Sequence, residues 1–141
     1  MENSSLSKEW LEYAAMDLKS AEFLLAMRPV PIEIICYHCE QAAEKLLKSV
    51  LVYYGQEPPK THDLVRLCTQ CSDLAPEFES LLGACAELTP YGVQARYPSG
   101  MELEERDMEH ALAACHRMAK FVLPKLDLTL DSQMGQMTGL E

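Results

Sequence analysis

The residues whose types and spacing best suit chemistry are His38, Gln41 and Lys45, which lie within one predicted helix. Their separations of three and four residues place them on one side of that helix, and we call them the polar row. A lysine offers a point charge to a phosphate, whereas glutamine and histidine offer directed hydrogen bonds. The polar row therefore predicts a site for a phosphate or a base. In the alternative interpretation Lys45 pairs with an acidic neighbour and Gln41 satisfies a backbone group, because buried polar groups normally have partners.

A second candidate site is formed by Arg96 and Tyr97, which lie in a predicted loop held by Pro98 and followed by a helix start. An arginine guanidinium can form two parallel hydrogen bonds with a phosphate, and a tyrosine ring can stack on a base. The alternative is a structural arginine that bonds carbonyl groups at a helix end. His62 is a further binding candidate; it is adjacent to Asp63, but neighbouring residues on a helix do not face each other. In the alternative interpretation, His62 is an ordinary residue at the start of a helix and has no functional role.

Two Cys-x-x-Cys pairs have the ligand spacing of zinc sites, namely Cys36 with Cys39 and Cys68 with Cys71. Both pairs fall in predicted helices and lack the Gly- or Pro-bearing turns of zinc knuckles. Buried cysteines also behave as small apolar residues. We therefore predict that the thiols are structural, and we predict no metal site and no cofactor.

The helix that carries the polar row is predicted over residues 36–54, which contain no Gly or Pro. Its apolar residues cover most of the helix circumference, so it belongs inside a bundle or a subunit interface. Gly55 is suited to cap its C-terminal end. An earlier helix follows from the apolar spacing between Trp10 and about Arg28, with serines before Trp10 as N-caps and two prolines after it.

Further helical segments and one loop complete the predicted architecture. They are a short helix over residues 62–71 capped by Thr61, with Asp63 in its first turn, a segment opening at Pro76, a loop over 91–100, and a last helix from Glu102 to Pro124. Alternating strand patterns are absent. We predict an all-α fold, an antiparallel up-and-down bundle of four to five helices over residues 1–126, with a flexible tail over 127–141.

The composition excludes several classes of protein. The chain has 22 acidic and 12 basic residues and a net charge of −10, which opposes indiscriminate binding of nucleic acid. It has no apolar run of about 18 residues and no basic-plus-apolar leader. Six cysteines without a secretory segment indicate reduced thiols. We expect a cytoplasmic protein that does not enter a membrane.

Four segments occur in an order that resembles a known family. They are Trp10-x-x-x-Ala14-x-x-Asp17-Leu18-x-x-Ala21, Cys39-Glu-Gln41-Ala-Ala-Glu44-Lys45-x-Leu47-Lys48-x-x-Leu51, Lys60-Thr-His-Asp-Leu64 and Arg96-Tyr-Pro98. Together they resemble the HEPN family of small helical domains over about residues 10–126. The resemblance implies a helical bundle that usually dimerises and is associated with nucleotides or RNA. Many relatives are RNA-cutting toxins or partners of minimal nucleotidyltransferases.

The nuclease motif of that family is not matched in this chain. In the family an arginine is followed, after four to six residues, by a histidine near the start of the last helix. Here the first histidine after Arg96 is His110, and only three residues separate Arg106 from His110. The sequence therefore leaves enzymatic activity undecided.

Three hypotheses follow. The first is a HEPN-like homodimer that binds a nucleotide or an RNA end in a cleft lined by the polar row and Arg96. The second is a metal-independent ribonuclease with Arg96 as electrostatic stabiliser and His62 or His38 as general base. The third is a non-enzymatic partner of a minimal nucleotidyltransferase or an antitoxin, as in a toxin–antitoxin pair.

Overall fold

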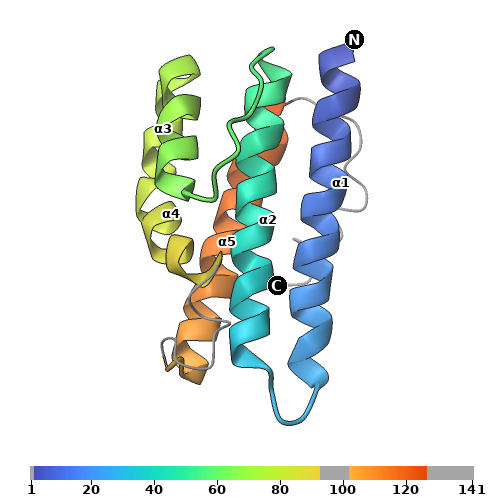
Figure 1. Ribbon diagram of the computed structural model, residues 1–141, viewed down its shortest axis with the longest axis vertical. Coiled ribbons are helices and arrows are strands. Elements are labelled where there is room, and N and C mark those ends of the chain that lie inside the picture. Colours follow the sequence, from blue (N-terminus) through green and yellow to red (C-terminus); the bar gives the residue numbers. More distant parts are fainter. Residues whose placement is uncertain (1, 93–101, 127–141) are drawn as a thin grey trace.

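The computed structural model describes residues 2–92 and 102–126, and within these ranges it is an all-α bundle, as predicted. Figure 1 shows α2 at the centre, with α1 on one side, α3 and α4 on the other, and α5 behind. The described helices are α1 (Glu2–Phe23), α2 (Ile32–Tyr53), α3 (Leu64–Leu74), α4 (Leu82–Leu88) and α5 (Glu105–Leu126), with 3-10 turns at Leu24–Ala26, Pro76–Leu81 and Thr89–Gly92. None of these helices is long and apolar enough to cross a membrane. Arg96, Tyr97, the predicted loop beyond residue 92 and the predicted tail lie outside the described residues.

The central place of α2 follows from its composition. Helices α1, α3, α4 and α5 all pack against α2. Its buried side chains point in several directions around its axis, as expected for a helix that is apolar over most of its circumference. They include Ile35, Cys36, Cys39, Ala42, Ala43, Leu46, Leu47, Val50 and Leu51. The helix that carries the polar row is therefore the central helix of the bundle.

The first helix differs from its prediction at both ends. It begins at Glu2 and not near Trp10, and it ends at Phe23 before a short 3-10 turn and not at Arg28. The serine Ser7, considered as an N-cap, lies inside the helix, and its buried hydroxyl donates a 2.8 Å hydrogen bond to the Ser49 carbonyl of α2. Local sequence patterns cannot predict this contact, because it joins residues that are far apart in the chain.

The third helix is capped by Asp63 and not by Thr61. The Asp63 carboxylate accepts hydrogen bonds from the backbone N–H groups of Val65 and Arg66, at 3.0 and 3.3 Å. The Thr61 hydroxyl instead accepts from the Asp63 N–H at 3.2 Å, so the helix starts two residues later than a Thr61 cap requires.

The last helix begins at Glu105 and continues through Pro124 to Leu126. Pro124 lies in the last turn, where it removes one intrahelical hydrogen bond, and the helix continues past it to the buried Leu126. The predicted stop at Pro124 was therefore two residues early.

The C-terminal end of α2 closes as predicted. Gly55 has a φ of 80°, and the N–H groups of Gly55 and Gln56 donate to the carbonyls of Val52 and Leu51, at 2.9 and 2.8 Å. This is the Schellman arrangement, in which a residue in the left-handed region ends the helix.

We expect Gly55→Ala to lower the free energy of unfolding by about 1 kcal/mol, because a Cβ disfavours the left-handed region. Urea unfolding measures the loss. The matched control is Gly83→Ala in α4, where an added Cβ meets nothing within 4 Å. That variant should gain stability, since alanine is the better helix former. Equal effects of both substitutions would contradict the assignment.

Candidate functional site

Two members of the polar row, His38 and Lys45, meet at one carboxylate. His38 Nδ1 lies 2.9 Å from one oxygen of Asp17, and the Lys45 ammonium bonds to its other oxygen. Asp17 comes from α1, which packs along α2 and presents its carboxylate between the two side chains. The three side chains are partly buried, with exposed fractions of 25% for His38, 24% for Lys45 and 13% for Asp17. Asp17 therefore fixes the His38 and Lys45 side chains while leaving both accessible.

The contact with Asp17 determines which hydrogen bonds His38 and Lys45 can still make to a ligand. In a neutral imidazole, the ring nitrogen that faces a carboxylate carries the hydrogen, which assigns Nδ1 as donor and leaves Nε2 as acceptor. The Lys45 ammonium has three hydrogens and uses one of them on Asp17. The pair thus presents a fixed acceptor next to a fixed cationic donor.

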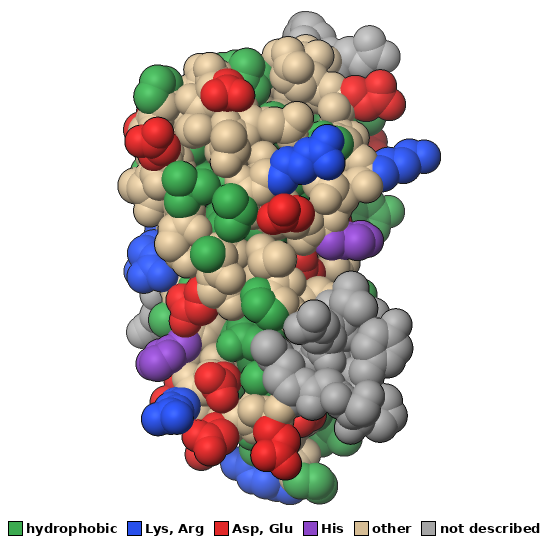
Figure 2. Space-filling model, turned by 60° about the vertical axis from the view of Figure 1, so that its left-hand side comes forward, with side chains coloured by type: hydrophobic (Ala, Val, Ile, Leu, Met, Phe, Trp, Pro, Cys, Tyr) green, Lys and Arg blue, Asp and Glu red, His purple; other side chains and the backbone are tan. Residues whose placement is uncertain are grey.

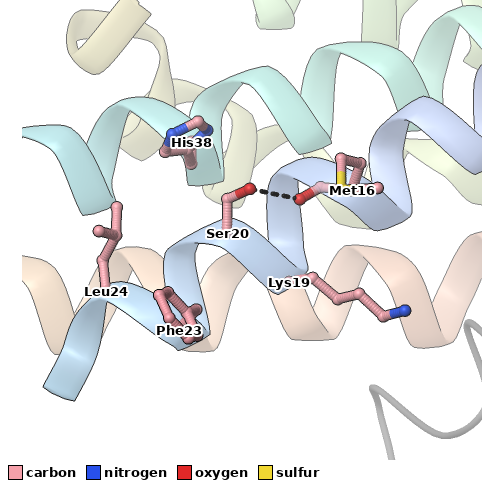
Figure 3. Close-up of a pocket in the computed structure, with 6 residues that line it drawn as sticks. All are labelled: Met16, Lys19, Ser20, Phe23, Leu24 and His38. Atoms are coloured by element: carbon pink, nitrogen blue, oxygen red, sulfur yellow. Dashed lines mark hydrogen bonds between the residues drawn. The ribbon is translucent and has the colours of Figure 1, made fainter.

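A hollow of about 400 Å³ lies beside His38, between α1 and α2. Most of its wall is apolar and belongs to α1. Its lining residues are Met16, Lys19, Ser20, Phe23, Leu24 and His38 (Figure 3). The Ser20 hydroxyl donates to the Met16 carbonyl at 2.8 Å, and Lys19 extends away from His38. His38 is thus the main polar group that the hollow presents.

The third member of the polar row, Gln41, binds a buried carboxyl group. Its Nε2 donates a 2.8 Å hydrogen bond to Oε1 of Glu40, whose exposed fraction is 0%. Burial raises the Glu40 pKa to about 8, and the hydrogen bond from Gln41 offsets only part of that shift. Oε2 of Glu40 has no hydrogen-bond partner among the described residues. Glu40 therefore carries a proton for most of the time at neutral pH.

A second cluster lies farther along α2, around Glu44. One Glu44 oxygen accepts a 2.9 Å bond from Lys48, and the other lies 2.9 Å from Nδ1 of His62. Lys48 also lies 5.7 Å from the centre of the Trp10 ring, within the range of a cation–π contact. Glu44 is 6% exposed and His62 is 69% exposed, so a buried carboxylate holds a surface imidazole. Glu44, and not the adjacent Asp63, orients His62.

We expect Glu44→Gln to lower the free energy of unfolding by about 2–3 kcal/mol, because Lys48 is only 10% exposed and would lose its counter-charge. Thermal or urea unfolding measures the change. The control is Glu104→Gln, which removes an ion pair with Arg106 whose side chains are 69% and 76% exposed. That control should stay within about 0.5 kcal/mol of the wild type. Similar losses in the two variants would show that Glu44 is not a buried counter-ion.

The charges on this face of α2 nearly balance. Lys45 is paired with Asp17, Lys48 is paired with Glu44, and Glu40 is largely neutral at pH 7. On the face formed by α3 and α4, acidic and basic side chains are interspersed, without a basic patch among the side chains described there (Figure 2). The described charges around the polar row therefore nearly cancel, so this face of α2 adds little local negative charge to the net charge of −10.

All six cysteines are buried. The thiols of Cys68 and Cys71 lie 3.2 and 3.5 Å from the carbonyl oxygens of Phe78 and Leu47. Burial raises the pKa of both Cys36 and Cys71 to about 12, which keeps these thiols protonated. Within the described residues, no three His, Cys, Asp or Glu side chains are placed to hold a metal ion. The Cys-x-x-Cys pairs fill the core.

A family model, the HEPN domain, matches residues 7–126 of the sequence. The chain belongs to the HEPN family. The crystal structure of ST0689, described as an archaeal HEPN homologue, superposes with a TM-score of 0.67 at 21% identity, covering 86% of this chain and 98% of that one. At that identity the likeness shows the fold alone. No curated protein matches the sequence.

Within this HEPN domain the predicted site residues are only partly brought together. His38 and Lys45 share Asp17, Gln41 binds Glu40, and His62 joins the Glu44 cluster. Arg96 and Tyr97 fall outside the described residues, so the structure does not place them. Their part in a site stays a prediction, as does that of the polar row.

Sequence reasoning offered an acidic partner for Lys45 as an alternative, but it named neither Asp17 nor the other acidic partners in this HEPN domain. Asp17 stands at a position where the spacing of α1 predicts an apolar residue, which was a signal of a buried charge. Glu44 and Lys48 are four residues apart, the spacing of a helical ion pair. Glu40 gave no signal of its own, because a glutamate in a helix is common and its burial depends on the surrounding elements.

Proposed function

We propose that this HEPN domain binds a nucleotide or an RNA end at the α2 face that carries the polar row. The observation that supports the proposal most directly is the shared carboxylate. Asp17 holds His38 and Lys45 in place, and each keeps hydrogen-bonding capacity that Asp17 does not use. Side chains that are already ordered lose less conformational entropy when a ligand binds.

The chemistry of the pair suits a phosphate group next to a ribose or a base. Lys45 provides the cation for a phosphate oxygen, and His38 Nε2 accepts a hydrogen bond from a hydroxyl or an amino group. The neutral Glu40 spares the ligand an extra negative charge at pH 7. The sequence predicts that Gln41, His62, Arg96 and Tyr97 contribute further contacts.

We expect Lys45→Ala to weaken the binding of labelled mononucleotides or of short 5′- or 3′-phosphorylated RNAs at least about tenfold, because a charge-assisted bond to phosphate is lost. Fluorescence anisotropy at fixed salt measures the affinity. The control is Lys125→Ala, which removes a lysine that pairs with Glu77 in the last turn of α5. Absence of saturable binding to the wild type, or equal losses in the two variants, would refute the proposal.

A second candidate function is metal-independent cleavage of RNA. It is favoured by the orientation of His38, whose Nδ1 is held by a carboxylate so that Nε2 can act as a general base. RNA incubated with the purified protein and a chelator should then be cut, and the His38→Ala/His62→Ala double variant should be inactive. If the protein binds RNA saturably but leaves it uncut, the binding function is supported and the ribonuclease function is refuted. An antitoxin or nucleotidyltransferase partner remains a prediction that a pull-down from the native cell tests.

A further inference from the structure

His38 and Ser20 both contribute hydrogen-bond acceptors to the hollow beside His38. The Nδ1 atom of His38 faces Asp17, which does not line the hollow, so the acceptor Nε2 is the ring nitrogen left for a ligand. The Ser20 hydroxyl uses its hydrogen on the Met16 carbonyl, at 2.8 Å, and its oxygen keeps only lone pairs to offer. These two side chains therefore favour a ligand group that donates hydrogen bonds.

The other described residues of the lining do not supply a donor beside His38. The side chains of Met16, Phe23 and Leu24 carry no polar hydrogen. Lys19 carries an ammonium group, but its side chain extends away from His38 (Figure 3). A ligand carbonyl placed against His38 would therefore meet an acceptor and find no donor among these side chains.

The apolar wall indicates which part of a nucleotide enters the hollow. The volume of about 400 Å³ lies within the range of small-molecule sites. The Phe23 ring and the Met16 thioether, which are 82% and 61% exposed, offer surfaces on which a flat base can pack. A ribose carries hydroxyl groups around its ring, and their burial against an apolar wall without partners is unfavourable. The base is therefore the part that fits the hollow.

The position of Lys45 gives the nucleotide its direction. His38 and Lys45 bond to the two oxygens of one carboxylate, that of Asp17, so their polar ends lie close together. Lys45 does not line the hollow. When a phosphate pairs with the Lys45 ammonium, the base of the same nucleotide lies on the side of His38 and the hollow.

We propose that the hollow beside His38 accepts a nucleobase that carries an exocyclic amino group and discriminates against bases that lack one. This inference rests on the proposed function and names the ligands that the site prefers. An amino group offers two hydrogens to the acceptors of His38 and Ser20. In hypoxanthine and uracil a carbonyl oxygen replaces the amino group, and the neighbouring ring nitrogen carries the polar hydrogen. The carbonyl oxygen then faces an acceptor of the hollow, which is left without a partner.

The test compares two matched pairs of nucleotides on the full chain. Adenosine and inosine monophosphates have the same charge and nearly the same size, and they differ by an amino group against a carbonyl oxygen; cytidine and uridine monophosphates form the second pair. Isothermal titration at fixed salt and pH 8, where histidine side chains are mostly neutral, measures each affinity. In each pair the nucleotide with the amino group should bind at least about tenfold more tightly, because a site that hydrogen-bonds a ligand group rejects the analogue without it.

Variants separate the contact to the base from the contact to the phosphate. His38→Ala should lower the affinity for the adenosine nucleotide towards that for the inosine nucleotide, and Ser20→Ala should reduce the preference by a smaller factor. Lys45→Ala should weaken both nucleotides equally and keep their ratio. His38→Ala leaves Asp17 paired with Lys45, so this variant should keep its helical circular dichroism. The matched control is His110→Ala, which changes an exposed histidine of α5 and should alter none of the affinities.

The outcomes distinguish this inference from the proposed function. Saturable binding of all four nucleotides with equal affinity within each pair would overturn the inference and leave the proposed function in place. A preference that survives unchanged in His38→Ala would also overturn it, and so would tighter binding of the inosine and uridine nucleotides, since His38 would then present a donor. Absence of saturable binding for all four nucleotides would overturn both.

Discussion

Glu40→Gln is expected to stabilise the protein by several kcal/mol at pH 9 and to change its stability little at pH 5. Glu40 is fully buried, and burial raises its pKa from 4.5 to about 8. At pH values between these two pKa values, Glu40 keeps its proton in the folded state and has lost it in the unfolded state. The free energy of unfolding of the wild type therefore falls as the pH rises through this window, by a total on the order of 4 kcal/mol.

Glutamine preserves the shape and cannot ionise, so the variant should lose this pH dependence. Its side-chain carbonyl can still accept the hydrogen bond that Gln41 donates to Glu40 Oε1. Urea unfolding at pH 5, 7 and 9 compares the two proteins, with Glu104→Gln as a control at a glutamate whose side chain is 69% exposed. Parallel pH profiles for the wild type and Glu40→Gln would show that Glu40 is ionised in the folded protein at neutral pH.

The fold was largely predictable because its determinants are local. The all-round apolar surface of α2 predicted its central position, and Gly55 predicted its end, since only composition and spacing were needed. The helix starts were less predictable. Thr61 and Asp63 are both good N-caps, and the choice between them depends on where α3 packs. Ser7 is likewise a suitable N-cap by type, but its hydroxyl bonds to the Ser49 carbonyl across the bundle, which only the packing of α1 against α2 determines.

The candidate site was predictable in its spacing and not in its partners. The sequence placed His38 and Lys45 on one side of α2, and the structure agrees. It did not name Asp17 as their common partner, because that requires the register between α1 and α2. The raised pKa of Glu40 is even harder to predict from the sequence, since it depends on burial by several elements, including the turn that ends at Gly92.

The contact between Gly92 and Glu40 leads to the second large effect. An added Cβ at Gly92 would lie 2.9 Å from Cδ of Glu40 and 3.0 Å from each of its carboxyl oxygens. The Glu40 side chain has little space to retreat, because it is fully buried and held by Gln41. We expect Gly92→Ala to lower the free energy of unfolding by about 2–3 kcal/mol through overpacking.

Gly83→Ala is the matched control for this substitution, because the same methyl group there enters open space. A double-mutant cycle then identifies the cause of the loss. Glu40→Ala removes the group with which the new methyl collides, so Gly92→Ala should cost much less in the Glu40→Ala background than in the wild type, and the two losses should not add. Additive losses would place the damage in the backbone of the 3-10 turn. Coupled losses would show that a glycine is required at position 92 because a buried carboxyl group occupies the space of its side chain.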